Sequence, residues 1–192
     1  IILIMLMVNI LEATLTDILR YKRYLNGISG LALTVAVCAL SGTWSYDAAV
    51  GNFYIVGAAG LAASLCYIVA YTIWNWIFVT NEFSSSVALM HVGFLLAPII
   101  GCVTTLWMGP AAGFGMWLLL RANTLAIGGW MQIAAKSWFE QQFYSPNFEK
   151  FVGWTKKNSV QVVFMLINLV LLGYCIFASV SAGTFAFPSL FI

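Results

Sequence analysis

The sequence predicts an all-α membrane protein built as a bundle of six transmembrane helices. Of the 192 residues, 62% are apolar and only 7% are charged, and the mean hydropathy is +0.97. A soluble domain carries about 25% charged residues, and disordered or nucleic-acid-binding chains carry more. The apolar runs are also continuous, whereas strands of a transmembrane barrel alternate between apolar and polar residues. These observations exclude a soluble domain, a nucleic-acid-binding protein and a β-barrel.

Six apolar runs approach the length of about 20 residues that a helix needs to cross a bilayer. The predicted spans cover residues 1–19, 27–42, 53–79, 87–108, 112–135 and 159–182. They form one polytopic domain over residues 1–192. Because the chain opens inside an apolar run, we expect further helices before Ile1. Pro98, inside the fourth span, should kink its helix and free a backbone carbonyl that a neighbour or water must satisfy.

The positions of lysine and arginine predict the orientation in the membrane. Six basic residues follow the first and fifth spans: Arg20, Lys22, Arg23, Lys150, Lys156 and Lys157. The connections after the second and fourth spans hold none. Since short cytoplasmic loops carry the excess of basic residues, we expect the loops at residues 20–26, 80–86 and 137–158 to be cytoplasmic.

Polar side chains inside the spans are the candidate functional residues. A charge near the bilayer centre costs on the order of 3 kcal/mol or more, so such residues should face the bundle interior. The predicted solute- or ion-binding residues are Asn9, Glu12, Asp17, Tyr71, Trp74, Asn75, His91, Arg121 and Gln132. Most fall in the cytoplasmic half, which predicts a polar cavity open to the cytoplasm.

Arg121 and Glu12 are predicted to pair near the middle of the membrane. Arg121 lies about 13 Å inside its span and Glu12 lies about 12 Å from Arg20, at 1.5 Å per helical residue. Asp17 is the second choice of partner for Arg121. The pair has two interpretations. It fixes the helix register, or it acts in function, with Arg121 binding an anionic group or Glu12 exchanging a proton or cation.

The sequence predicts no metal site and no cofactor. The four cysteines are spread over different spans, and His91 is the only histidine, whereas a zinc site needs clustered ligands. His91 is either a hydrogen-bonded packing residue or a proton acceptor. The chain shows no nucleophile elbow and no phosphate-binding glycine loop. No catalytic residue is therefore assigned, and an enzyme is the less favoured interpretation.

Four short motifs resemble those of one protein family. They are Asn9-Ile10-Leu11-Glu12-Ala13 with Asp17, Asn26-Gly27-Ile28-Ser29-Gly30, Tyr71-Thr72-Ile73-Trp74-Asn75 and Arg121-Ala122-Asn123-Thr124-Leu125-Ala126. In order and spacing, over residues 9–135, they resemble an uncharacterised family of bacterial polytopic membrane proteins, catalogued only as a domain of unknown function. The resemblance implies an inner-membrane protein with further helices before Ile1. Thr72 stands where that family has an acidic residue, so an acidic ligand role is not carried over to this position.

Three functions are compatible with these features. The favoured one is a transporter or channel for a small polar solute or ion, because the spans carry buried charges and a predicted kink. The alternatives are a structural or sensory membrane subunit, whose ion pair only organises the bundle, and an intramembrane enzyme acting on lipid, with His91 or Glu82 as the acid or base. The expected partners are the lipid bilayer and the solute, and a homo-oligomer is also open.

Overall fold

The computed structural model describes residues 2–41, 44–47, 52–55, 60–108 and 113–188. Residues 1, 42 and 112, at which predicted spans begin or end, lie outside this part of the chain. The helices are α1 (Ile2–Leu15), α2 (Tyr24–Ala36), α3 (Leu61–Glu82), α4 (Ser85–Thr104), α5 (Trp117–Ala134), α6 (Lys136–Gln142), α7 (Pro146–Thr155) and α8 (Asn158–Ser181). One turn of π-helix, Thr16–Arg20, continues α1, and a 3-10 turn, Val37–Leu40, continues α2.

Among the described residues, four helices are long and apolar enough to cross a membrane: Ile2–Arg20, Leu61–Glu82, Ser85–Met108 and Asn158–Ser181. The structure thus supports a helical membrane protein and does not confirm all six predicted spans. The second apolar helix, Tyr24–Leu40, is shorter. Helix α5 carries Arg121, Asn123 and Gln132, which lower its hydropathy.

The structure corrects the prediction at the start of the third span. Residues 52–55 form strand β2 (Asn52–Ile55), which pairs antiparallel with β1 (Trp44–Asp47), so that Trp44 lies opposite Ile55. Within the described residues, α3 begins only at Leu61. An apolar run of this length reads equally as strand or helix by periodicity alone, which is why residues 53–55 were wrongly assigned to the span.

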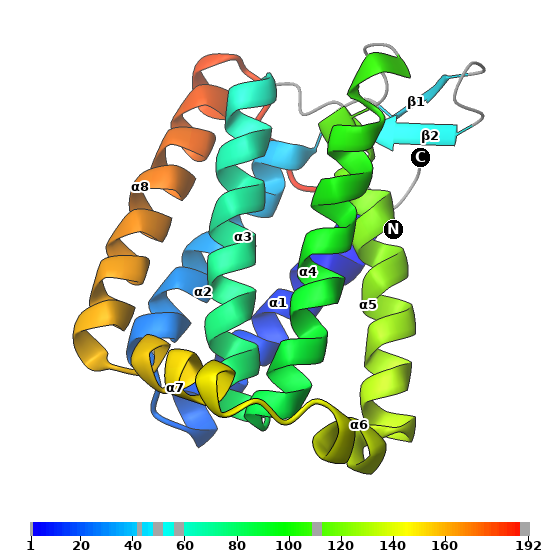
Figure 1. The fold of residues 1–192 in the computed structure, drawn as a ribbon. Helices are drawn as coiled ribbons and strands as arrows, with labels where there is room; N and C mark the ends of the chain where they lie inside the picture. The colour runs from blue at the N-terminus through cyan, green and yellow to red at the C-terminus, as the bar shows by residue number, and fades with distance from the viewer. Residues whose placement is uncertain (1, 42–43, 48–51, 56–59, 109–112, 189–192) are drawn as a thin grey trace.

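The segment predicted as a cytoplasmic loop at residues 137–158 contains two short helices, α6 and α7. Ser145 caps α7 by accepting a hydrogen bond from the backbone N–H of Phe148, and Pro146 occupies the first turn, where its missing N–H costs nothing. Phe148 packs edge-on against Trp76 of α3, with ring centroids 5.9 Å apart. Figure 1 shows α6 and α7 at one end of the bundle, which we call the α7 end, and the strands at the opposite end, the hairpin end.

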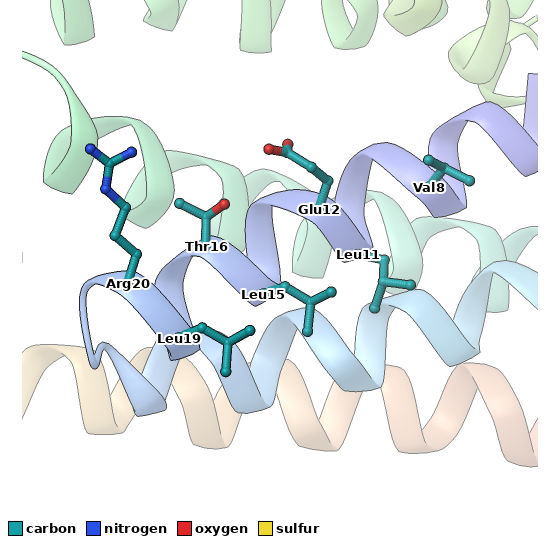
Figure 2. A pocket seen from close by; sticks show the side chains of 7 residues that line it. All are labelled: Val8, Leu11, Glu12, Leu15, Thr16, Leu19 and Arg20. Carbon is teal, nitrogen blue, oxygen red and sulfur yellow. The ribbon is translucent and has the colours of Figure 1, made fainter.

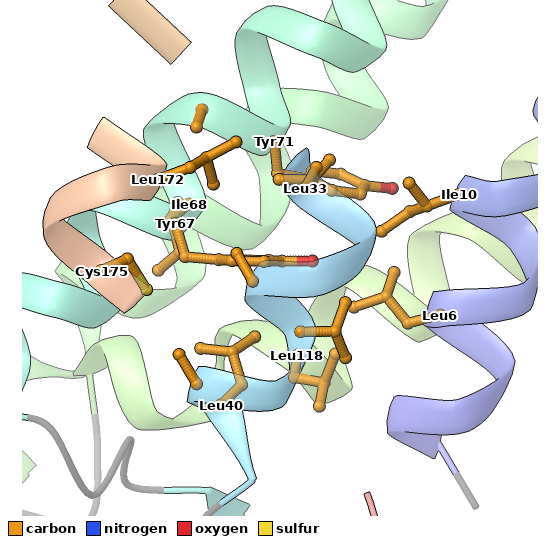
Figure 3. Close-up of a cluster of buried hydrophobic side chains, with 14 of the residues drawn as sticks. Leu6, Ile10, Leu33, Leu40, Tyr67, Ile68, Tyr71, Leu118, Leu172 and Cys175 are labelled. Carbon is orange, nitrogen blue, oxygen red and sulfur yellow. The ribbon is translucent and has the colours of Figure 1, made fainter. Parts of the chain in front are cut away.

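The buried core lies where α1, α2, α3, α5 and α8 meet. Its largest members include Ile10 of α1, Leu33 of α2, Tyr67 and Tyr71 of α3 and Leu172 of α8 (Figure 3). Association of helices in lipid depends on close packing, which small residues allow. Gly30 of α2 illustrates this, because an added Cβ would overlap the Thr14 hydroxyl and lie 2.7 Å from the Trp74 indole nitrogen.

Candidate functional site

Arg121 is the centre of the largest buried polar network in the described residues. It lies one turn into α5, and only 1% of it is exposed. Its Nε donates to the Tyr71 hydroxyl at 3.2 Å, and its Nη2 donates to Asn75 Oδ1 at 3.3 Å. Its Nη1 donates to the Phe94 carbonyl at 2.9 Å and to Thr124 Oγ1 at 3.4 Å. Arg121 therefore connects α5 with α3 and α4.

The Phe94 carbonyl is available to Arg121 because of Pro98. In an α-helix the N–H of residue 98 would bond to the carbonyl of residue 94, but proline has no N–H. Pro98 lies inside α4, and the carbonyl that it leaves free is the one that Arg121 contacts. Of the two predicted partners for the carbonyl freed by Pro98, a neighbour or water, the structure shows a neighbour, Arg121.

A chain of three neutral side chains continues from Arg121 towards the α7 end. His91 Nε2 lies 2.8 Å from Asn75 Oδ1, and His91 Nδ1 lies 2.8 Å from Gln132 Nε2. An amide oxygen only accepts and an amide nitrogen only donates, so this arrangement requires a neutral imidazole with its hydrogen on Nε2. Asn75 Oδ1 thus accepts from both Arg121 and His91.

Aromatic side chains surround the Arg121 side of the network. The guanidinium carbon lies 5.3 Å from the centroid of the Tyr71 ring, within range of a cation–π interaction. Trp74 and Trp117 pack on Tyr71 with centroids 5.9 and 5.2 Å away. The hydroxyls of Tyr67 and Tyr71 both point towards α1 in Figure 3. The predicted binding residue Trp74 is thus buried and packs against the ring of Tyr71.

No carboxylate compensates the charge of Arg121 within the described residues, where both ion pairs are made by Arg23. The predicted Glu12–Arg121 pair is therefore wrong, and so is the second choice, Asp17. A guanidinium has five N–H groups. The contacts above use one on Nε, two on Nη1 and one on Nη2, so one Nη2 hydrogen has no protein acceptor in the described part of the chain.

Glu12 lies on the outer face of α1 and not in the bundle. Its side chain is exposed and points to the same side as Thr16 and Arg20, while Leu11, Leu15 and Leu19 line the rest of a shallow groove of about 490 Å³ (Figure 2). The sequence argument failed because depth along a helix gives no rotation about its axis. Glu12 points away from the bundle, whereas Arg121 is buried inside it.

Asp17 belongs to a second polar cluster, at the α7 end of α1, α2 and α3. Arg23 Nη1 lies 3.3 Å from Asp17 Oδ1 and 3.5 Å from Glu82 Oε2. Asn26 donates to Asp17 Oδ2 at 2.7 Å, and the Tyr21 hydroxyl donates to Glu82 Oε1 at 2.9 Å. The hydrogen bond to Glu82 raises the pKa of the Tyr21 hydroxyl above its ordinary value of 10.0. We call these five residues the Arg23 cluster.

A cleft between α1 and α5 leads to Arg121. It has a volume of about 420 Å³ and is lined by Ile2, Met5, Leu6, Asn9, Leu118, Arg121, Ala122, Leu125, Ala126 and Gly129. Asn9 and Arg121 are the polar members of this lining. The structure therefore brings the predicted residue Asn9 to the same cavity as Arg121.

The single cavity predicted from the sequence is thus divided. Tyr71, Asn75, His91, Arg121 and Gln132 form the network, and Asp17 and Glu82 form part of the Arg23 cluster. Sequence reasoning missed the acceptors Phe94 and Thr124. A signal existed for both, since Phe94 precedes Pro98 by four residues and Thr124 follows Arg121 by three. Within the described residues, no group of three or more His, Cys, Asp or Glu side chains could hold a metal ion.

No family model, curated protein or solved structure matches this chain. Membership of the family that its motifs resemble therefore stays a prediction, and the function must be inferred from the site.

Proposed function

We propose that the chain is a membrane transporter or channel for a small polar solute or ion, and that the Arg121 network is its binding site. The observation that carries this proposal is a fully buried guanidinium held only by neutral acceptors. A buried charge without a counter-ion is costly, and intramembrane charges of this kind mark substrate and ion pathways.

The extent of the network supports a pathway. Arg121 and Gln132 are eleven residues apart on α5, which corresponds to about 16 Å along the axis at 1.5 Å per residue. Polar groups therefore cover about half of a hydrocarbon core that is about 30 Å thick. Asn75 and His91 fill the interval from α3 and α4. These groups can replace part of the hydration shell of a solute.

The topology that we propose has six crossings, with α2 and α5 added to the four long helices. Helix α2 packs against α1, α3 and α8, and α5 packs along α4. Both run between the α7 end and the hairpin end (Figure 1), as a membrane-crossing helix would. The basic residue Arg23 follows α1, Lys150 lies in α7, and Lys156 follows α7 directly. By the positive-inside rule, the α7 end faces the cytoplasm of a bacterial inner membrane.

Flux through purified protein in liposomes tests this proposal. Wild type is compared with Arg121→Gln and Glu12→Gln, using an internal pH-sensitive dye and imposed gradients of potassium chloride, potassium acetate and potassium octanoate, with the flux of empty liposomes subtracted. We expect flux in wild type, its loss in Arg121→Gln and its retention in Glu12→Gln, since Glu12 faces outward. Flux that is absent from wild type, or unchanged in Arg121→Gln at equal folded yield, would overturn the assignment.

A structural or sensory subunit is a second candidate, favoured by the exposed position of Glu12. A carboxylate at this depth is costly in lipid, and a partner helix with a basic or hydroxyl side chain would cover it. Co-purification of a stoichiometric second chain from native membranes, lost in Glu12→Leu, would support this function. A monodisperse single-chain protein with Arg121-dependent flux would exclude it.

A further inference from the structure

The cleft between α1 and α5 has one charged residue in its floor and a mostly apolar lining. Leu6, Leu118 and Arg121 are buried and form the floor, whereas Met5 and Ala126 are exposed. Asn9 is also exposed and lies on the α1 side. In the topology proposed above, these positions of α1 and α5 lie within the hydrocarbon region, so the cleft would open towards lipid.

The floor of the cleft carries a positive charge, that of Arg121. Arg121 carries a full charge without a carboxylate in the described residues, and one of its Nη2 hydrogens is unused. Hydrogen bonds in which one partner is ionised are about twice as strong as neutral ones, and arginine suits the planar geometry of carboxylate and phosphate. The Asn9 amide adds a second donor group to the same lining.

The walls of the cleft are apolar and suit a hydrocarbon. Ile2, Met5, Leu125 and Ala126 are apolar, and a hydrated inorganic ion would gain nothing from them. The volume of about 420 Å³ falls within the range of about 300–1,000 Å³ that is usual for small-molecule sites. The lining thus combines one cation, one amide and a long apolar surface.

We infer that this cleft binds an amphiphilic anion, a molecule with a carboxylate or phosphate head and a hydrocarbon body, which enters from the bilayer. Arg121 and Asn9 hold the head, and the apolar stretches of α1 and α5 hold the body. The inference rests on the proposed function, for which it names the substrate class. A free acid such as octanoate and the headgroup of an anionic phospholipid share this chemistry.

Binding of radiolabelled octanoate to the chain in phosphatidylcholine nanodiscs tests the inference, with empty nanodiscs subtracted. We expect saturable binding that is at least about tenfold weaker in Arg121→Gln, as for the loss of one charged hydrogen bond. Ala126→Phe fills the cleft without touching the network and should weaken binding similarly. Ala97→Phe, the same change at an exposed alanine of α4 outside the cleft, is the matched control and should bind as wild type does.

Competition separates the sources of the anion. Nanodiscs that also contain phosphatidylglycerol should weaken octanoate binding if a phospholipid headgroup occupies the cleft, and should leave it unchanged if a free acid is the ligand. Acetate, which lacks the body, and octyltrimethylammonium, which has the opposite charge, should not compete in either case.

The two proposals fail in different ways. Octanoate binding that is equal in wild type, Arg121→Gln and Ala126→Phe, or that octyltrimethylammonium displaces, would overturn the amphiphilic-anion site. If Arg121-dependent flux of potassium or chloride persists in that case, the transport proposal survives. Arg121-dependent octanoate binding without any flux would support the site and overturn transport.

Discussion

Arg23 and Arg121 occupy opposite electrostatic situations in the same bundle. Arg23 lies at the α7 end and contacts two carboxylates, those of Asp17 and Glu82, at 3.3 and 3.5 Å. Arg121 lies inside the bundle and contacts only neutral oxygens. The side chain of Arg23 is 25% exposed, whereas Arg121 is almost completely buried. The more deeply buried cation is thus the one that lacks a counter-ion.

This difference favours a structural role for Arg23 and a ligand-binding role for Arg121. The Arg23 cluster joins the ends of α1, α2 and α3, and each of its charged groups lies within 3.5 Å of an opposite charge, so it needs no ligand to explain it. Arg121 is already saturated with hydrogen bonds except for one N–H, yet its charge is not compensated. Hydrogen bonding positions a guanidinium and only an anion neutralises it. Arg121 is therefore the better candidate for binding an anion.

The largest expected effect comes from exchanging each arginine for methionine. Arg23→Met should destabilise the protein by about 3 kcal/mol, because it leaves the buried Asp17 carboxylate without its cation. Arg121→Met should change stability by less than about 1 kcal/mol, because the lost hydrogen bonds are offset by removal of an uncompensated buried charge. Thermal unfolding in detergent measures both variants. Equal losses of stability would mean that Arg121 is structural as well.

The contact between α4 and α5 gives the next effect. A Cβ at Gly128 would lie 2.8–3.1 Å from the Phe94 ring, whereas a Cβ at Gly129 would meet nothing within 4 Å. Gly128→Ala should therefore destabilise by about 2 kcal/mol through overpacking and weaken octanoate binding, since Phe94 also carries the carbonyl that holds Arg121. Gly129→Ala is the control and should gain helix stability. The same unfolding assay compares the two variants. A loss of stability in Gly129→Ala but not in Gly128→Ala would contradict the contact between Gly128 and Phe94.

Asn75→Asp should give Arg121 a carboxylate partner, as Arg23 already has in the Arg23 cluster. The substitution keeps the shape of the side chain and places a carboxylate where Arg121 Nη2 now meets a neutral oxygen at 3.3 Å. We expect a gain in stability of about 1 kcal/mol, because a charged acceptor strengthens the bond, together with loss of octanoate binding. If the variant is more stable and still binds octanoate, anion recognition does not need an uncompensated charge on Arg121.

The smallest effect is expected for Tyr21→Phe, at the edge of the Arg23 cluster. Because the pKa of the Tyr21 hydroxyl is raised by its bond to Glu82, the folded state favours the protonated phenol. This stability is fully present below the ordinary pKa of 10.0 and is lost as the pH rises through the raised value. Unfolding midpoints from pH 8 to 11 should fall above about pH 10 in wild type, and this part of the fall should be absent from Tyr21→Phe.

Hydropathy predicted six membrane helices, and four helices in the described part of the chain are long and apolar enough to cross a membrane, because length and apolar content are properties of a segment alone. It failed for β2, since residues 53–55 at the start of an apolar run carry no periodicity that separates strand from helix. The site was predicted in part. Arg121, Asn75 and His91 were selected by their polarity and depth, and they do meet. The pairing of Arg121 with Glu12 failed because it depended on how α1 is rotated against α5, which only the packed structure provides.

Pro98 and Arg121 are not independent residues. The proline removes the donor that Phe94 would have used, and the arginine on the next helix supplies the replacement. Restoring a backbone N–H at position 98 would remove the reason for one of the guanidinium's bonds, so the effect of losing Arg121 depends on whether proline is present. Such contacts typically show coupling energies of about 0.5–3 kcal/mol in double-mutant cycles. In evolutionary terms the two positions are epistatic: a change at one alters which residues the other can accept.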